Sequence, residues 1–177
     1  MEQAEEELLV LAVQDGDQEA FKQLYLCYHK PLGRFAYKLC GSTELAQDAL
    51  QDSWLKASHS IRKIRDPRTF RSWIYRLVRW RCLDLMRQHS KEKLYEYFNE
   101  SVHKDLTSSE LDKAIEQSDE LNTAMAKMPA MEKQIIHLFY LDELTIAEIG
   151  TILSIPEGTV KSRLSRVRTL LREKFEV

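Results

Sequence analysis

The clearest hydrophobic pattern in the chain is an apolar stripe near its C-terminus. It recurs at steps of four, three and four residues, the spacing of one helix face, in Val160, Leu164, Val167 and Leu171. A shorter apolar face precedes it, in Ile149, Ile152 and Leu153. Between the two, Ser154 and Pro156 break the pattern, and proline suits the first turn of a new helix. The pattern predicts two helices joined by a tight turn.

Capping signals mark the start of the first of these helices. The run Thr145-Ile146-Ala147-Glu148 is a capping box, in which the Thr hydroxyl and the Glu carboxylate each satisfy an unpaired backbone N–H. Leu144 and Ile149 stand where a hydrophobic staple would fix the entry angle of the chain. Gly150, four residues before the turn, permits the two helices to cross closely. These features predict a helix-turn-helix.

The polar face of the second helix carries candidate DNA contacts. Opposite the apolar stripe lie glycine and small polar residues: Gly158, Ser162, Ser165 and Thr169. Cations line the two shoulders of this face, Lys161, Arg168 and Arg172 on one and Arg163 and Arg166 on the other. Small residues let a helix approach the major groove closely while flanking cations reach phosphates. The pattern favours a DNA recognition helix, and an amphipathic hairpin that merely faces water is the alternative.

The rest of the chain also reads as helix, so we expect an all-α protein. The chain has only five glycines and four prolines, and no sustained alternation of polar and apolar residues predicts a strand. A short helix over residues 8–13 is followed by one that Asp17 caps. We expect Pro31 to interrupt that helix and Gly41 to end the segment after it.

An acidic segment with few apolar residues divides the chain. Residues 90–118 contain four Lys against seven Asp and Glu, and neither Gly nor Pro. We expect a linker here, with some partner-dependent helix, between a small helical domain over 1–89 and another over 119–177. Such a linker would let the two domains change their relative position.

The segment 42–58 predicts a helix with one packed face and one free face. The packed face consists of small or apolar residues: Ala46, Ala49, Leu50, Ser53, Trp54 and Ala57. The other face presents Asp48, Gln51, Asp52, Leu55 and Lys56. A leucine within a mainly acidic face indicates a protein-binding surface, but single exposed leucines are common, so plain exposure to solvent is an equal alternative.

A basic loop and a basic helix follow. The loop contains Arg62, Lys63 and Arg65, and the helix is predicted from Phe70 to about Arg87. The core stripe of this helix is Phe70, Trp73, Ile74, Leu77 and Leu85, with Arg81 and Asp84 spaced as a structural ion pair. Its far face carries Ser72, Tyr75, Arg76 and Arg79, with Trp80 on a shoulder. Aromatic rings among arginines suit stacking on unpaired bases, and an ordinary basic surface helix is the alternative.

The distribution of charge supports two nucleic-acid contacts. The formal net charge is only -2, but residues 62–87 hold nine Lys and Arg against two acids. Residues 161–174 hold six against one. Two basic patches separated by acidic surface indicate two nucleic-acid contacts and a different partner elsewhere.

Several other function classes find no support in the sequence. The acidic N-terminus does not resemble a secretory signal, and no apolar stretch is long enough to insert into a membrane. Three widely spaced cysteines favour reduced thiols in the cytoplasm. There is no glycine-rich phosphate loop, nucleophile–base arrangement or metal-ligand spacing. We therefore expect a non-enzymatic protein with no cofactor and no metal site.

An ordered set of motifs resembles the extracytoplasmic-function (ECF) sigma factors of bacterial RNA polymerase. The first motif is Asp15-Gly16-Asp17 with Ala20-Phe21, and the second is Ala46-Gln47-Asp48 with Gln51-Asp52. The third is Phe70 with Trp73-Ile74-Tyr75-Arg76-Leu77, Asp84 and Arg87. The fourth is Gly158-Thr159-Val160-Lys161-Ser162-Arg163-Leu164 with Arg166 and Arg168. Each motif alone has low specificity, but the set covers nearly the whole chain in the right order. Trp80 departs from the family, which usually has Asn there.

The resemblance implies a function and a set of partners. It implies a factor that binds core RNA polymerase through the face at 48–56, directs it to promoter DNA and helps to open the duplex. The basic loop and helix would hold the melted minus-ten strand, and the recognition helix would read the minus-thirty-five duplex. An anti-sigma factor is a further expected partner, and no additional regulatory domain is expected after Val177. A stand-alone helix-turn-helix regulator is the alternative, although it accounts only for the C-terminal third of the chain.

Overall fold

The protein is built from helices arranged in two parts. The computed structural model describes residues 2–99 and 128–175, and every regular element in these ranges is helical, which confirms the all-α prediction. The N-terminal part contains α1 (Gln3–Gln14), α2 (Gln18–Cys40), α3 (Thr43–Ser60), the 3-10 turns η1 (Ile61–Lys63) and η2 (Pro67–Thr69), and α4 (Phe70–Asn99). The C-terminal part contains α6 (Ala130–Ile136), the π-helical turn η4 (His137–Leu141), α7 (Ile146–Leu153) and α8 (Glu157–Phe175).

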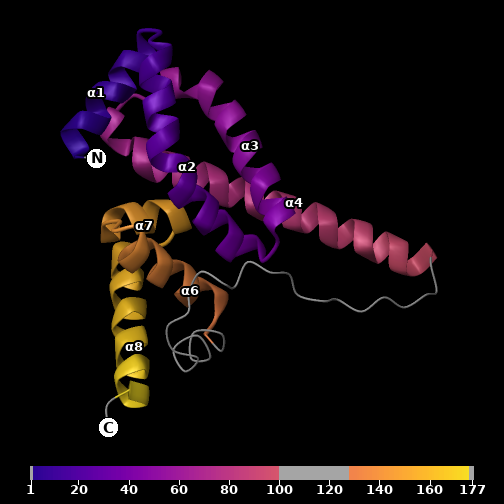
Figure 1. Cartoon of the computed structure of the whole chain (residues 1–177). Coiled ribbons are helices and arrows are strands. Elements are labelled where there is room, and N and C mark those ends of the chain that lie inside the picture. The colour runs from indigo at the N-terminus through magenta and orange to yellow at the C-terminus, as the bar shows by residue number, and fades with distance from the viewer. Residues whose placement is uncertain (1, 100–127, 176–177) are drawn as a thin grey trace.

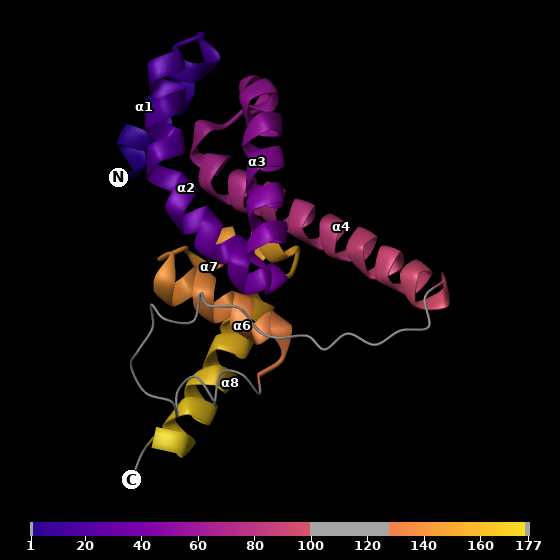
Figure 2. The same ribbon diagram turned by 45° about the vertical axis from the view of Figure 1, so that its right-hand side comes forward.

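The two parts pack directly against each other. Figures 1 and 2 agree in placing α6 and α7 beside one end of α2, while α8 points away from the N-terminal helices. Helix α4 of the N-terminal part also packs against α7. A single hydrophobic core therefore runs through both parts, from Val10 and Leu24 to Ile149 and Val160.

Helix ends follow the capping residues that the sequence predicts. The Asp17 carboxylate accepts hydrogen bonds from the backbone N–H groups of Glu19 and Ala20, at 2.8 and 3.2 Å. Gly41 ends α2 in the left-handed conformation, with φ of 67°. The hydroxyl of Ser42 then caps α3. The connection between α2 and α3 is therefore set by local sequence.

The predicted break at Pro31 is wrong, because α2 runs through it without interruption. The proline lacks the N–H that would bond to the carbonyl of Cys27, an exposed residue at which water is available. Buried residues continue on both sides of the proline, Leu24 and Tyr28 before it and Leu32 and Phe35 after it. Tertiary packing of this continuous apolar face outweighs the local cost of a proline inside a helix.

The long helix α4 is buried over a wider arc than the sequence predicts. Helices α2 and α3 pack on it, and α7 packs on it as well. Consequently Val78 and Cys82 join Ile74 in the core with no exposed surface. Ser72 and Tyr75 are only 7% and 1% exposed, so the prediction that they lie on an open face is wrong.

The end of α4 also differs from the prediction. The helix extends to Asn99 instead of ending near Arg87, so the first residues of the predicted linker are helical. The remainder of that linker, 100–118, lies outside the described residues. The predicted Arg81–Asp84 pair on this helix is confirmed, with 2.7 Å between Nη1 and Oδ2.

Replacing Pro31 by Ala should stabilise the protein. The substitution restores a backbone N–H for helical hydrogen bonding and removes the clash of the proline ring with the preceding turn. It also gives the unfolded chain more conformational freedom, which offsets part of this gain. The free energy of unfolding should therefore rise by roughly 1–2 kcal/mol. Denaturant unfolding followed by circular dichroism measures the change. Lys30→Ala, at an exposed position of the same helix, is the control and should shift stability by less than about 0.5 kcal/mol. Destabilisation by Pro31→Ala would show that the proline supports the native helix.

Candidate interaction surfaces

The C-terminal helix-turn-helix has the geometry that its sequence predicts. The backbone N–H of Thr145 donates to the Glu148 carboxylate at 2.7 Å, and the N–H of Glu148 donates to the Thr145 hydroxyl at 3.3 Å. Ser154 ends α7 in the left-handed conformation. A Cβ atom on Gly150 would lie 2.9 Å from the carbonyl oxygen of Ile155, so the turn requires a residue without a side chain there.

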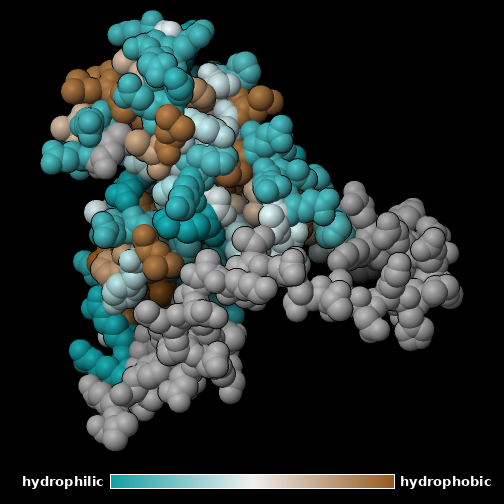
Figure 3. Space-filling view, in the orientation of Figure 1, coloured by the Kyte–Doolittle hydropathy of each residue, from teal (hydrophilic) through white to brown (hydrophobic). Residues whose placement is uncertain are grey.

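One face of α8 is buried and the opposite face is open. Val160, Leu164 and Val167 are at most 3% exposed, as predicted, and the side chain of Leu171 lies outside the described residues. Seven predicted DNA-contact residues are exposed: Lys161, Ser162, Ser165, Arg166, Arg168, Thr169 and Arg172. Figure 3 shows hydrophilic residues along the visible side of this helix. The open face therefore combines small polar residues with cations, as the sequence predicts.

The remaining predicted DNA contact, Arg163, forms an ion pair with Glu132 of α6. Its Nη1 lies 2.5 Å from Oε1 of Glu132 on α6, and the side chain of Glu132 is only 6% exposed. A buried carboxylate needs a cation or hydrogen-bond donors to offset the loss of hydration. Arg163 therefore holds α8 against α6. Glu132 shares a helix face with the buried Ile135 and Ile136. Because acidic side chains are rarely buried unless they are paired, an acid on such a face indicates in the sequence that a cationic partner lies nearby.

Arg168 is exposed but is also held by aromatic residues. Its Nε donates to the hydroxyl of Tyr140 at 2.9 Å, and its guanidinium carbon lies 5.7 Å from the ring centroid of Phe139. These contacts orient the guanidinium at the shoulder of α8. Since the partners are far away in the sequence, spacing along α8 alone does not reveal them.

The predicted partner face on α3 is exposed. Asp48, Gln51, Leu55 and Lys56 are open to solvent, and Leu55 keeps 66% of its surface exposed. Asp52 is half-buried, because its Oδ2 lies 2.6 Å from Nη2 of Arg81 on α4. Arg81 therefore bridges Asp52 and Asp84, which fixes the orientation of α3 on α4.

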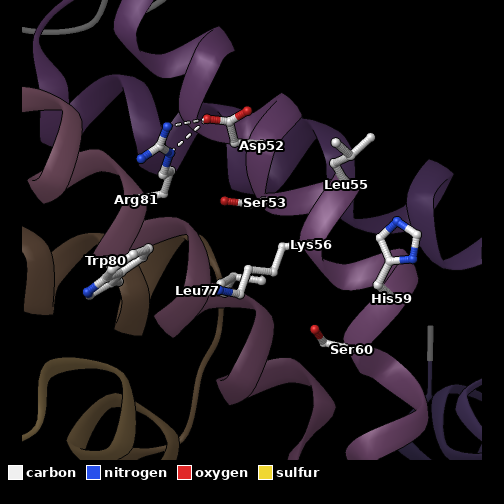
Figure 4. Close-up of a pocket in the computed structure, with 9 residues that line it drawn as sticks. All are labelled: Asp52, Ser53, Leu55, Lys56, His59, Ser60, Leu77, Trp80 and Arg81. Atoms are coloured by element: carbon white, nitrogen blue, oxygen red, sulfur yellow. Dashed lines mark hydrogen bonds and ion pairs between the residues drawn. The ribbon is translucent and has the colours of Figure 1, made fainter.

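An open groove of about 510 Å³ runs between α3 and α4 beside this face. Figure 4 shows its lining, with Leu55, Lys56 and His59 from α3 and Leu77, Trp80 and Arg81 from α4. The Lys56 ammonium lies 5.6 Å from the centre of the Trp80 ring, a cation–π distance. Trp80, which is 55% exposed, therefore adjoins the predicted partner face, a neighbourhood that periodicity on α4 alone does not indicate.

The basic loop before α4 is exposed, and hydrogen bonds from α1 hold its backbone. Arg62, Lys63 and Arg65 are all open to solvent. The side-chain amide of Gln14 donates to the carbonyl oxygens of Ile61 and Ile64, at 3.1 and 2.8 Å. Sequence patterns do not indicate this role of Gln14, because the hydrogen bonds join residues that are 47 and 50 positions apart in the chain. These two hydrogen bonds fix the loop backbone from which Arg62, Lys63 and Arg65 project.

The predicted strand-binding residues of α4 are not brought together on one open face. Arg76 is exposed, but Ser72 and Tyr75 are buried. Arg79 is half-buried: its Nε donates to Oε1 of Gln134 on α6 at 3.0 Å, and burial lowers the pKa of its guanidinium. Of the eight predicted strand contacts, five are exposed, Ser72 and Tyr75 are buried, and Arg79 is bonded to the C-terminal part.

Neither a metal centre nor a membrane helix is found within residues 2–99 and 128–175. No three His, Cys, Asp or Glu side chains in these ranges are grouped as metal ligands. None of the helices there combines the length and the apolar character needed to cross a membrane.

Comparison with protein families matches both parts of the chain. Residues 24–92 match Sigma-70 region 2, and residues 124–173 match Sigma-70, region 4. The ECF RNA polymerase sigma factor SigW of Bacillus subtilis (strain 168) is 28% identical over 173 residues, covering 92% of both chains. The ECF RNA polymerase sigma factor SigM of Mycobacterium tuberculosis (strain H37Rv) is 31% identical over 173 residues, covering 96% of this chain and 84% of the relative.

Two solved structures share the fold. CnrH, in complex with the cytosolic domain of CnrY, superposes with a TM-score of 0.67 at 20% identity and 96% coverage of both chains. The sigma factor RpoE, in complex with the anti-sigma factor NepR from Bartonella quintana, also gives a TM-score of 0.67, at 22% identity and with 89% of this chain and 97% of that chain covered. The two matched regions, with a relative that is 31% identical and covers 96% of this chain, show that this chain belongs to the ECF family of RNA polymerase sigma factors.

Proposed function

We propose that this sigma factor binds core RNA polymerase through the α3–α4 face and directs it to promoters that α8 recognises. The observation that carries the proposal is that one chain has two separate exposed surfaces of different chemical character. One is the exposed acidic and apolar face around Leu55, and the other is the open cationic face of α8. Neither surface contains a catalytic arrangement, so we propose a non-enzymatic initiation factor that acts in the cytoplasm, where transcription takes place.

The two DNA contacts are proposed to differ in kind. The exposed cations of α8 suit a duplex, because a helix with a small polar centre fits the major groove. The anchored cations Arg62, Lys63 and Arg65, with Arg76 of α4, suit a single strand, whose backbone needs neutralisation. We retain 1–89, 90–118 and 119–177 as the proposed division of the chain into a minus-ten domain, a linker and a minus-thirty-five domain.

An anti-sigma factor is a proposed further partner. The similar structures of CnrH and RpoE were each determined with another protein bound, and NepR is an anti-sigma factor. The free groove between α3 and α4 gives such a partner a surface to cover. A stand-alone regulator is not favoured, because it accounts for neither the Sigma-70 region 2 match nor the α3–α4 face.

Leu55→Lys should weaken binding to core polymerase. The leucine is 66% exposed at the centre of the proposed face, so the change introduces a charge there without disturbing the core. We expect the dissociation constant to rise roughly tenfold, as for loss of an interface anchor. Leu8→Lys, at a residue of α1 that is 68% exposed, is the matched control. Fluorescence anisotropy with labelled protein measures both, and equal affinities for the two variants would argue against this face.

Arg166→Ala and Arg172→Ala should affect promoter recognition differently. Arg166 lies nearer the N-terminus of α8, the part that enters the groove in helix-turn-helix proteins. Its loss should relax preference at one or two upstream base pairs and cost roughly 1–3 kcal/mol on the best site. Loss of Arg172 should weaken all sequences alike and lower the salt slope by about one phosphate contact. Holoenzyme binding to a randomised upstream element at two salt concentrations distinguishes these effects, and the opposite result would exchange the two roles.

Arg163→Ala should destabilise the C-terminal part instead of altering base preference. The substitution leaves the Glu132 carboxylate buried without its cation. Because Arg163 itself is 36% exposed, we expect a loss of about 1–3 kcal/mol in unfolding free energy, below the cost of a fully buried pair.

The control for this prediction is Arg166→Ala, an exposed change on the same helix that should alter unfolding free energy by less than about 0.5 kcal/mol. The double variant Glu132→Met with Arg163→Met replaces the pair by apolar side chains and should recover most of the loss. Chemical denaturation measures all three. An unchanged stability in Arg163→Ala would mean that the ion pair does not hold α8.

A further inference from the structure

Tyr140 and Arg168 form a small exposed cluster at the shoulder of α8. Tyr140 lies in the π-helical turn η4 and keeps 48% of its surface exposed. The Arg168 Nε donates a hydrogen bond to the Tyr140 hydroxyl at 2.9 Å. The Phe139 ring packs edge-on against the Tyr140 ring, at 4.9 Å between centroids, and its centroid lies 5.7 Å from the Arg168 guanidinium carbon. The guanidinium is therefore held by two aromatic residues while it stays open to solvent.

The hydrogen bond between these two residues leaves most of their donors unused. The Tyr140 oxygen is the acceptor in it, so the hydroxyl proton is available to another acceptor. Arg168 uses its Nε, and the N–H groups of its two Nη atoms remain. No acceptor for these protons is found within residues 2–99 and 128–175. The pair therefore offers a phenolic hydroxyl and a guanidinium edge, side by side, to a ligand from solvent.

Arg168 differs from two other arginines of the protein in the charge of its partner. Arg163 pairs with the carboxylate of Glu132, and Arg81 pairs with two carboxylates of its own. A carboxylate compensates the charge of the guanidinium that it orients, whereas the Tyr140 hydroxyl is neutral. Arg168 is therefore oriented but keeps its full positive charge, and a cation that is already oriented loses less conformational freedom when it binds an anion.

The π-helical turn η4 sets the position of Tyr140. The backbone N–H of Asp142 bonds to the carbonyl oxygen of His137, five residues earlier, at 3.1 Å. Leu138 of the same turn is fully buried and fixes it to the core. Such turns are rare and often lie at functional sites, and tyrosine is enriched at interfaces because its ring is apolar and its hydroxyl polar. A half-exposed tyrosine on this turn therefore indicates a binding role.

The place of the pair favours the DNA backbone as its ligand. Arg168 lies on the same shoulder of α8 as Lys161, two helical turns away, or about 10.5 Å along the helix axis. The centre of a recognition helix faces the base edges in the major groove, and its shoulders face the sugar-phosphate strands. Phosphate oxygens accept hydrogen bonds from both tyrosine and arginine, and a guanidinium can bind two of them at once.

We propose that Tyr140 and Arg168 together form a clamp for one backbone phosphate of the upstream promoter element, which makes Tyr140 a DNA contact outside the helix-turn-helix. The guanidinium edge binds the free phosphate oxygens, and the Tyr140 hydroxyl donates to one of them. The clamp extends the DNA interface from α8 to η4. It rests on the proposed function, because it requires duplex DNA beside α8.

Methylphosphonate interference on the holoenzyme tests the clamp. Each phosphate of the upstream element is replaced in turn by a neutral methylphosphonate, and the dissociation constant is measured for each DNA. One replacement should weaken binding of the parent protein roughly tenfold, as for loss of a charge-assisted hydrogen bond. Arg168→Ala should be insensitive to that replacement, and its salt slope should fall by about one. Tyr140→Phe should bind all unmodified sequences about threefold to tenfold more weakly, with reduced interference at the same phosphate.

Tyr37→Phe, the same change at a half-buried residue of α2, is the control and should keep the affinity and the interference pattern of the parent. The clamp is overturned if Tyr140→Phe keeps both as well, whatever Arg168→Ala does. It is also overturned if both variants lower the free energy of unfolding but keep the parent pattern, because the pair would then only brace α8. If the parent shows interference at no upstream phosphate, the proposed duplex contact of α8 fails together with the clamp.

Discussion

The burial of α4 between two layers of helices is the constraint on which the rest of this structure depends. Helices α2 and α3 cover one side of it, and α7 covers another. Ile74, Tyr75 and Val78 form the centre of this contact and are at most 1% exposed. Because both parts of the chain bury apolar surface on the same helix, the position of α4 determines where the basic loop, the α3–α4 groove and the recognition helix lie relative to one another.

Within this framework, ion pairs use several of the cations that a charge count assigns to DNA. Arg81 bridges Asp52 and Asp84, and Arg163 neutralises the buried Glu132. A cation used in this way orients a helix and is less available to phosphate, because its charge is already compensated. The net charge of a basic segment therefore overstates the charge that it offers to nucleic acid.

A polar cluster around Asp142, in the turn between η4 and α7, accompanies the apolar contact on α4. The Asp142 side chain is 1% exposed, its Oδ2 lies 3.2 Å from Nε2 of His137, and its Oδ1 lies 3.8 Å from Nη2 of Arg34 on α2. The Arg71 guanidinium of α4 donates to the backbone carbonyl of Asp142. A buried carboxylate needs such neighbours to offset its loss of hydration, so the cluster links the turn before α7 to both α2 and α4.

The sequence by itself determined the local structure of this protein and which side of α8 is exposed. The caps at Asp17, Gly41 and Thr145 and the apolar stripes of α3 and α8 are confirmed, because capping and helical periodicity depend on residues a few positions apart. Only the tertiary structure decided that α2 continues through Pro31 and that Ser72 and Tyr75 are buried. It also decided that Glu132 and Asp142 hold distant partners. These outcomes depend on a second packing surface for α4 and on contacts between residues far apart in the chain, and periodicity within a single helix carries no information about either.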